Sequence, residues 1–188
     1  MLKEKYSGDT LRKLILPYSD FHPFPRACER EQWEGLPEEL RNKWIQTGEQ
    51  YLDFTWPPLP ATRFMDFKRN GNRSEFEKLH FKRRHVLASL VLAECMEGKG
   101  RFLDQIVNGI WAICEETFWG VSAHNIVSKY PGAPLPDVNE PIIDLFAGET
   151  AGLLAWAYYL LKPQLDDITP LICERIEYEV KMRIRDPY

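Results

Sequence analysis

A short glycine-flanked link between two helix-period segments constrains the fold of this chain more than any other sequence feature. Apolar residues recur at helical spacing from Leu79 to Leu90 and again from Leu103 to Cys114. The link Gly98–Gly100 is so short that the two helices must run antiparallel. Since no segment has the alternating pattern of a strand, the sequence predicts an all-α fold whose repeating unit is the helical hairpin.

The ends of the first helix of this pair carry residues that favour helix termini. Ser74 and Glu77 have the spacing of a capping box, in which the serine hydroxyl accepts from the Glu77 amide and the carboxylate bonds back to the helix start. Gly98 is expected to end the helix in the left-handed conformation.

A second hairpin is expected in the last third of the chain. Its first helix covers about 141–161, and Glu149 is its one charge beyond residue 144. Gly148 and Gly152 lie four residues apart, which would let the backbone of another helix approach closely. Pro163 and residues 165–168 are expected to form the link.

The last helix is expected to begin with Thr169 as its cap and Pro170 in its first turn. Its apolar stripe and its outward ion pairs follow the helical spacing. The stripe consists of Ile172, Ile176, Val180 and Ile184, and the pairs are Glu177–Lys181 and Glu179–Arg183.

Prolines punctuate the first sixty residues. The runs His22–Pro25 and Trp56–Pro60 cannot be helical, because proline disfavours helix at the residue before it. Between them, Leu36–Glu39 has the proline and acids of a helix start. We expect one domain over 1–188, in which 1–60 wraps a body of helical hairpins formed by 61–188.

Charge and cysteine spacing exclude several classes. The net charge of −4 argues against nucleic-acid binding, which depends on clustered Lys and Arg. We interpret the one basic run, Lys82–His85, as a solvated helix face. Met1–Lys5 leads into no apolar signal segment, and the four cysteines lack CxxC spacing, so three of them read as core residues. The apolar run at 145–161 is shorter than the roughly 20 residues of a spanning helix, so we expect no membrane partner. The cysteine spacing and the absence of a signal segment favour a cytoplasmic protein. We also expect no metal and no other cofactor.

The connection from Phe118 to Pro141 is the most informative stretch. Loops longer than roughly 12–15 residues are uncommon in compact domains and are often functional. The polar and aromatic groups at this loop are Glu115, Glu116, Trp119, His124 and Asn125. Flat aromatic faces with carboxylate and amide groups are the chemistry that binds saccharides.

Each of these residues also has a structural interpretation. Acids at a helix C-terminus are unfavourable, so Glu115 or Glu116 could pair with Arg63, Arg83 or Arg101. Trp119 could belong to the core and His124 could be a packed loop residue. Glu149 in an apolar helix should be ion-paired or line a groove, with surface exposure as the remaining alternative.

Two segments resemble the N-terminal helical region of heparinase II/III-type polysaccharide lyases. They are WAICEETFWGVSAHN, from Trp111 to Asn125, and IDLFAGETA, from Ile143 to Ala151. The opening from Leu16 to Pro25 is similar to members of the family that lack a secretion signal.

The resemblance implies an incomplete (α/α) toroid whose inner helices line a sugar groove. Family enzymes cleave acidic polysaccharides by β-elimination: a Tyr or His base removes the C5 proton of a uronate while Asn or His neutralises its carboxylate. Those catalytic residues belong to later hairpins and β-sandwich domains, so none is carried over. The groove-side positions that the resemblance implies are Trp119, His124, Asp144 and Glu149, with Glu116 less directly matched.

We therefore expect the N-terminal part of a longer lyase, inactive alone, that binds a polysaccharide or oligosaccharide and docks against the remaining helices and β-sandwich domains. Apolar faces meant for those helices should cause self-association. The alternatives are a stand-alone helical module for carbohydrate binding or interaction, and a different (α/α)-barrel glycan hydrolase that would use Asp144 and Glu149 as acid and base.

Overall fold

The computed structural model describes residues 5, 8–17, 20–126 and 129–188, and every regular element within these ranges is a helix. The all-α prediction is therefore confirmed, whereas closure into a toroid stays a prediction. Residues 1–4 and 18–19, which belong to the segments read for a signal peptide and for the family resemblance, lie outside the described residues.

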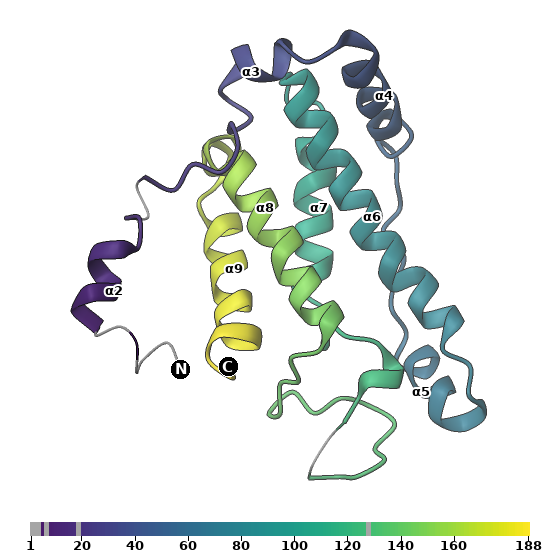
Figure 1. The fold of residues 1–188 in the computed structure, drawn as a ribbon. Helices are drawn as coiled ribbons and strands as arrows, with labels where there is room; N and C mark the ends of the chain where they lie inside the picture. The colour runs from purple at the N-terminus through teal and green to yellow at the C-terminus, as the bar shows by residue number, and fades with distance from the viewer. Residues whose placement is uncertain (1–4, 6–7, 18–19, 127–128) are drawn as a thin grey trace.

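Two helical hairpins form the body of the molecule (Figure 1). Ser74–Glu97 (α6) pairs with Leu103–Cys114 (α7), and Leu145–Ile168 (α8) pairs with Leu171–Val180 (α9). α6 also contacts α8, and α7 contacts α9. Because each hairpin reverses the chain, α6 and α8 run parallel in one layer and α7 and α9 run parallel in the other. This is the two-layer arrangement from which toroids are built.

The turn between α6 and α7 is fixed by a glycine and a buried acid. Gly98 ends α6 with φ of 68°, in the left-handed region that the sequence predicts. The carboxylate of Glu94, which is 1% exposed, accepts from the amide nitrogens of Gly100 at 2.8 Å and Phe102 at 3.4 Å. An acid at the N-terminus of α7 is favourable, because the free amides of that turn need acceptors.

The core lies between the two layers and consists mainly of branched aliphatic side chains. Its fully buried members include Leu87, Leu90, Ile106, Ile110, Ile113, Leu154, Leu161 and Leu165. Cys95, Cys114 and Cys173 are buried without disulfides, as predicted. Burial raises the pKa of the Cys95 and Cys114 thiols to about 12, so these cysteines act as packing residues.

In the described part of the chain before the hairpins there are four shorter helices. They are Gly8–Leu14 (α2), Arg30–Glu34 (α3), Glu38–Glu49 (α4) and Ala61–Asn70 (α5). α4 packs along α6, while α2 has no buried residue and stands apart from the body (Figure 1). The two proline-rich runs are non-helical, as predicted.

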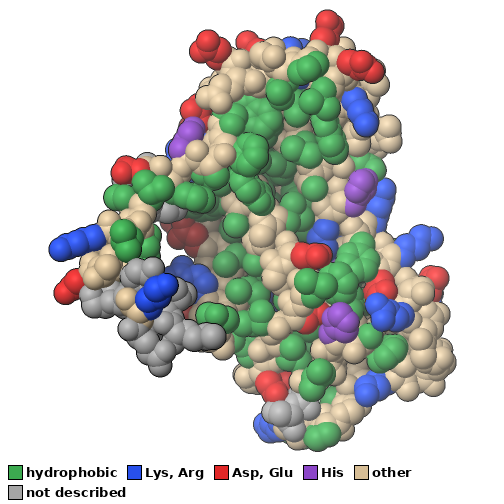
Figure 2. All heavy atoms as spheres, viewed as in Figure 1, with side chains coloured by type: hydrophobic (Ala, Val, Ile, Leu, Met, Phe, Trp, Pro, Cys, Tyr) green, Lys and Arg blue, Asp and Glu red, His purple; other side chains and the backbone are tan. Residues whose placement is uncertain are grey.

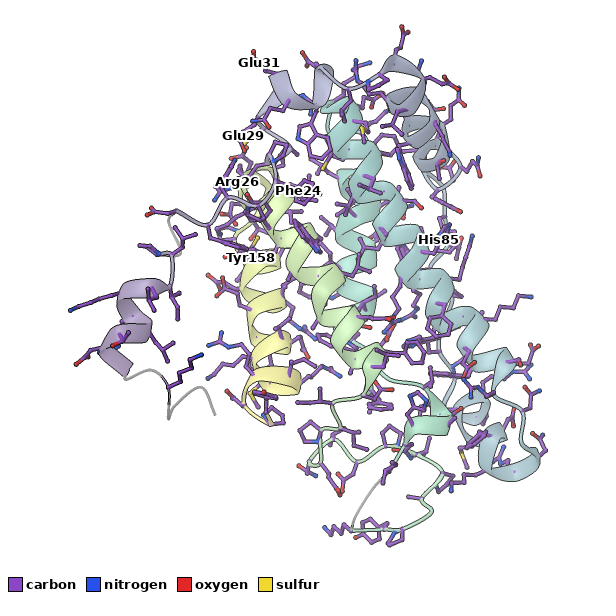
Figure 3. All side chains as sticks on the ribbon, viewed as in Figure 1. Phe24, Arg26, Glu29, Glu31, His85 and Tyr158 are labelled. Carbon is purple, nitrogen blue, oxygen red and sulfur yellow. The ribbon has the colours of Figure 1, made fainter. Side chains whose placement is uncertain are left out.

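The first of these runs crosses the end of α8. Tyr159 Oη donates to the carbonyl oxygen of Phe24 at 2.6 Å, and the amide of Ala27 donates to the carbonyl of Leu160 at 2.9 Å. Figure 3 shows Phe24, Arg26 and Glu29 gathered near Tyr158 at this end of the helix.

The predicted capping box at the start of α6 is wrong. Ser74 is the first helical residue, the N-cap residue Arg73 makes no side-chain cap, and the amide of Glu75 donates to Asn72 Oδ1 at 3.5 Å instead. Glu77 instead forms an ion pair with Arg73, whose Nε lies 2.5 Å from Oε1. The acid therefore finds a stronger, charged partner one turn back than a serine-centred box would give it.

The predicted bounds of the second hairpin also need correction. α8 begins at Leu145, where Asp144 Oδ1 accepts from the amide of Ala147 at 2.6 Å, and it continues through Pro163 to Ile168. Residues 165–168 are thus its last turn, and Thr169 and Pro170 make the link. Ile172 and Ile176 are buried as predicted, but Glu179 is buried as well, between Arg175 and Arg183.

Gly148 and Gly152 do not meet another helix. A Cβ built on either has no neighbour within 4 Å, and both residues are exposed. An apolar groove of about 600 Å³, which neither glycine lines, lies between α6 and α8, and its walls include Val91, Leu153 and Trp156. Figure 2 shows apolar side chains gathered on this face of the molecule.

Candidate functional site

Arginines converge on the C-terminal end of α7, where the carbonyl groups of the last turn need donors. Arg83 reaches it from α6, while Arg175 and Arg183 reach it from the opposite side. The hydrogen bonds run from Arg83 Nη1 to Ala112 O (2.8 Å), Arg175 Nη2 to Cys114 O (3.1 Å) and Arg183 Nη1 to Thr117 O (3.0 Å). Cations stabilise this negative end of the helix dipole, which explains how two glutamates can follow it.

Glu116 is the deeper of these two acids and is only 6% exposed. Its Oε1 lies 3.0 Å from Arg83 Nη1, and its Oε2 lies 2.6 Å from Arg84 Nη2. Arg84 Nε also donates to Thr150 Oγ1 at 2.9 Å, which ties α8 to the network. Of the partners that the sequence allows, Arg83 is confirmed.

The interpretation of Lys82–His85 as a solvated face is therefore wrong for its middle residues. Arg83 is 8% exposed, and its charge is tolerated because Glu116 lies in contact with it. Of the four residues in this run, only His85 is exposed, on the outer side of α6 (Figure 3).

His80 lies beside this network without joining it. Its Nδ1 is 3.9 Å from Glu116 Oε2, the residue is fully buried, and neither ring nitrogen has a hydrogen-bond partner. Burial, and then the charges of Arg84 and Arg83, lower the pKa of His80 from 6.5 to about 2. The imidazole is therefore neutral at physiological pH.

A pocket of about 540 Å³ opens between α5, α6 and the end of α7. We call it the Trp56 pocket. Its aromatic walls are Trp56, Phe64, Phe76 and Phe118, and its charged lining residues are Arg83, Glu115 and Glu116. Apolar walls with a few convergent polar groups are typical of small-molecule sites.

A second pocket, of about 700 Å³, shares Glu115–Phe118 with the first and extends toward α9. Its charged lining residues include Arg175, Glu179 and Arg183, which are paired with one another. The loop contributes Pro136 to both pockets, so the predicted functional loop does border them.

Glu115 differs from its neighbour Glu116 in being exposed. Within the described part of the chain its carboxylate has no hydrogen bond and no ion pair, yet it lines both pockets. It is thus the charged group of this region that remains available to a ligand.

Trp119, predicted to face a sugar groove, belongs to the core. It is 1% exposed, its Nε1 donates to the carbonyl of Ile113 at 2.9 Å, and the guanidinium of Arg183 lies 4.8 Å from the ring centroid. Although the residue borders the second pocket, its faces are covered by protein. Of the two interpretations of Trp119, the structure therefore agrees with the one that places its side chain in the core.

The structure brings His124 and Asp144 together. His124 Nδ1 lies 2.7 Å from Asp144 Oδ2, and the imidazole stacks on Phe146 with an interplanar angle of 7°. Since Asp144 also caps α8, this pair closes the base of the long loop. Neither residue lines the two pockets.

Glu149 is exposed, which is the third of the three environments that its sequence context left open. It lies on the same open face of α8 as Gly148 and Gly152 and lines neither pocket at the end of α7. An exposed carboxylate needs no partner, because water solvates it.

The sequence interpretation missed Trp56, Phe64, Phe76 and Phe118 as pocket residues. Trp56 packs across α7, where its Nε1 donates to Gln105 Oε1 at 2.8 Å and its ring covers Gly109. The available signal was Gly109, a glycine inside a helix, which marks the close approach of another group.

Searches against known proteins add no relative: no family model and no curated protein matches the chain. In residues 5, 8–17, 20–126 and 129–188, no helix is both long and apolar enough to cross a bilayer. The same residues include no cluster of His, Cys, Asp and Glu suited to a metal ion.

Proposed function

We propose that this chain is the N-terminal helical region of a heparinase II/III-like polysaccharide lyase and binds acidic, uronate-containing polysaccharide. Cleavage would occur by β-elimination, with the base and the carboxylate-neutralising group supplied by later hairpins and β-sandwich domains. The chain alone is then a binding domain without lyase activity.

The Trp56 pocket carries this proposal. Trp56 and Phe118 are partly exposed and offer flat apolar faces to the C–H groups of a sugar ring. Glu115 offers carboxylate oxygens that accept from hydroxyl groups. Its volume of about 540 Å³ lies within the range of small-ligand sites.

The arrangement of the hairpins supports the same proposal. A toroid requires hairpins side by side with like helices parallel, and the contacts of α6 with α8 and of α7 with α9 have that geometry. The long loop and the two pockets lie together at the end of α7, which is the end where a groove rim would be formed.

Calorimetric titration with heparan oligosaccharides, which alternate uronate with amino-sugar units, tests the proposal. We expect binding that Trp56→Ala abolishes and that Trp156→Ala, an exposed tryptophan on α8, leaves unchanged. Absorbance of unsaturated product should stay flat with the chain alone. Binding that is indifferent to Trp56 contradicts the proposed site, and robust cleavage contradicts the assignment of catalysis to other domains.

A stand-alone carbohydrate-binding module is the second candidate, because the Trp56 pocket combines aromatic walls with the available carboxylate of Glu115. The same titration with neutral glucans and chitin fragments separates the two, since a module of this kind need not prefer uronates. The hydrolase alternative finds no support in the geometry: Asp144 is engaged by His124 and Ala147, and Glu149 faces solvent.

A further inference from the structure

Two adjacent glutamates at the end of α7 have opposite environments, and this difference bears on which sugar the Trp56 pocket admits. We propose that the pocket takes a sugar ring without a carboxylate, a neutral or amino sugar, with Glu115 accepting from its hydroxyl or ammonium groups. The inference rests on the proposed function and names the unit of the polysaccharide that occupies this pocket.

The charges that line the pocket sum to −1, from the carboxylates of Glu115 and Glu116 and the guanidinium of Arg83. Arg83 is already engaged: its Nε and Nη2 donate to the carbonyl of Pro57 at 2.9 and 2.6 Å, and its Nη1 bonds Glu116. Arg84, the other partner of Glu116, does not line the pocket. The guanidinium of Arg83 is therefore already paired within the protein and is not available to a ligand.

A uronate placed in this pocket would bring its carboxylate beside the unpaired one of Glu115. Like charges at such short range repel, and the lining residues hold no free cation to offset the repulsion. A neutral ring avoids this cost, because two neighbouring hydroxyls can both donate to one carboxylate.

An ammonium group gains further from the aromatic walls. Trp56, Phe64, Phe76 and Phe118 surround the space next to Glu115, and aromatic faces attract cations. The order of affinity that follows is amino sugar, then neutral sugar, then uronate. In a polysaccharide of mixed units, the uronate would lie outside this pocket.

Amide chemical-shift titrations with glucosamine, glucose and glucuronate test the inference. We expect shifts around the Trp56 pocket and an affinity for glucosamine roughly two- to fivefold above that for glucuronate, the range measured for exposed charge pairs. Glu115→Gln should remove the difference. The matched variant Glu149→Gln, an exposed glutamate on α8, should keep it.

Equal or tighter binding of glucuronate at the pocket overturns the inference, as does a preference that survives Glu115→Gln. Either result leaves the proposed function standing if uronate-containing oligosaccharides still bind through Trp56. Conversely, the expected monosaccharide order without any binding of those oligosaccharides supports the inference and removes the lyase assignment.

Discussion

Arg84 and Glu116 form a two-point ion pair, in which Nη2 lies 2.6 Å from Oε2 and Nη1 lies 3.1 Å from Oε1. The pair joins α6 to the end of α7 in the interior, next to the Trp56 pocket. Planar pairs of this kind fix orientation as well as distance. Glu116 thereby holds the segment on which Glu115 and Phe118 are presented to a ligand.

Loss of the Glu116 charge should destabilise the folded protein. Glu116→Gln leaves Arg83 and Arg84 without their buried counter-ion, and we expect the free energy of unfolding to fall by about 3–5 kcal/mol. Glu115→Gln is the matched control and should change it by less than about 0.5 kcal/mol, because that side chain is exposed. Urea denaturation measures both, and equal effects would contradict the assigned roles.

Stability should decrease with acidification because of His80. The unfolded chain binds a proton near pH 6.5, whereas the folded state excludes it until about pH 2, so the unfolded state holds more protons between these values. The free energy of unfolding should then fall by up to about 1.4 kcal/mol per pH unit below pH 6.5. His80→Leu should flatten this dependence between about pH 6.5 and 4.5.

The exposed His85 provides the control for that measurement, since His85→Gln should leave the slope as it is. Thermal or urea denaturation at several pH values gives the slopes. A wild-type stability that is constant over this window would mean that His80 is protonated in the folded protein.

A methyl group at Gly109 should disturb the Trp56 pocket. A Cβ built there overlaps the Trp56 ring, with Cζ2 only 2.6 Å away. Gly109→Ala should destabilise the protein by about 1–3 kcal/mol through overpacking and weaken sugar binding. Gly152→Ala, in open space on α8, should instead stabilise by about 0.5–1 kcal/mol. Denaturation curves in which both substitutions change the free energy of unfolding in the same direction would contradict the close packing of Trp56 on Gly109.

The apolar groove between α6 and α8 should promote self-association. Its walls include Val91, Leu153 and the exposed Trp156. Light scattering should show a mass that rises with concentration, and Trp156→Glu should reduce it because a charge in the contact opposes association. A strictly monomeric wild-type chain would contradict this prediction.

The hairpins could be predicted because their signals are local. Helical spacing in 103–114 and the glycine at 98 depend on neighbours in sequence, and the structure has both. The site could not be predicted in the same way. The sequence left Arg83 either on a solvated helix face or as one of three possible partners of Glu115 or Glu116, and because Glu116 is 33 residues away only the fold shows that they meet.

The aromatic residues illustrate the same limit. Trp119 and Trp56 are both tryptophans near polar residues in sequence, yet Trp119 is covered and Trp56 borders the pocket. Which of them is open depends on how the long loop and the proline-rich run pack against α7. His124 and Asp144 were each named from the family resemblance, but their contact spans 20 residues and has no sequence signature.

A crystal structure of the chain with a bound uronate-containing oligosaccharide tests the central claim most directly. The account predicts density for a sugar ring in the pocket walled by Trp56 and Phe118, with ring hydroxyls or an ammonium on Glu115. Density elsewhere on the surface, or an unliganded pocket at saturating oligosaccharide, would contradict it.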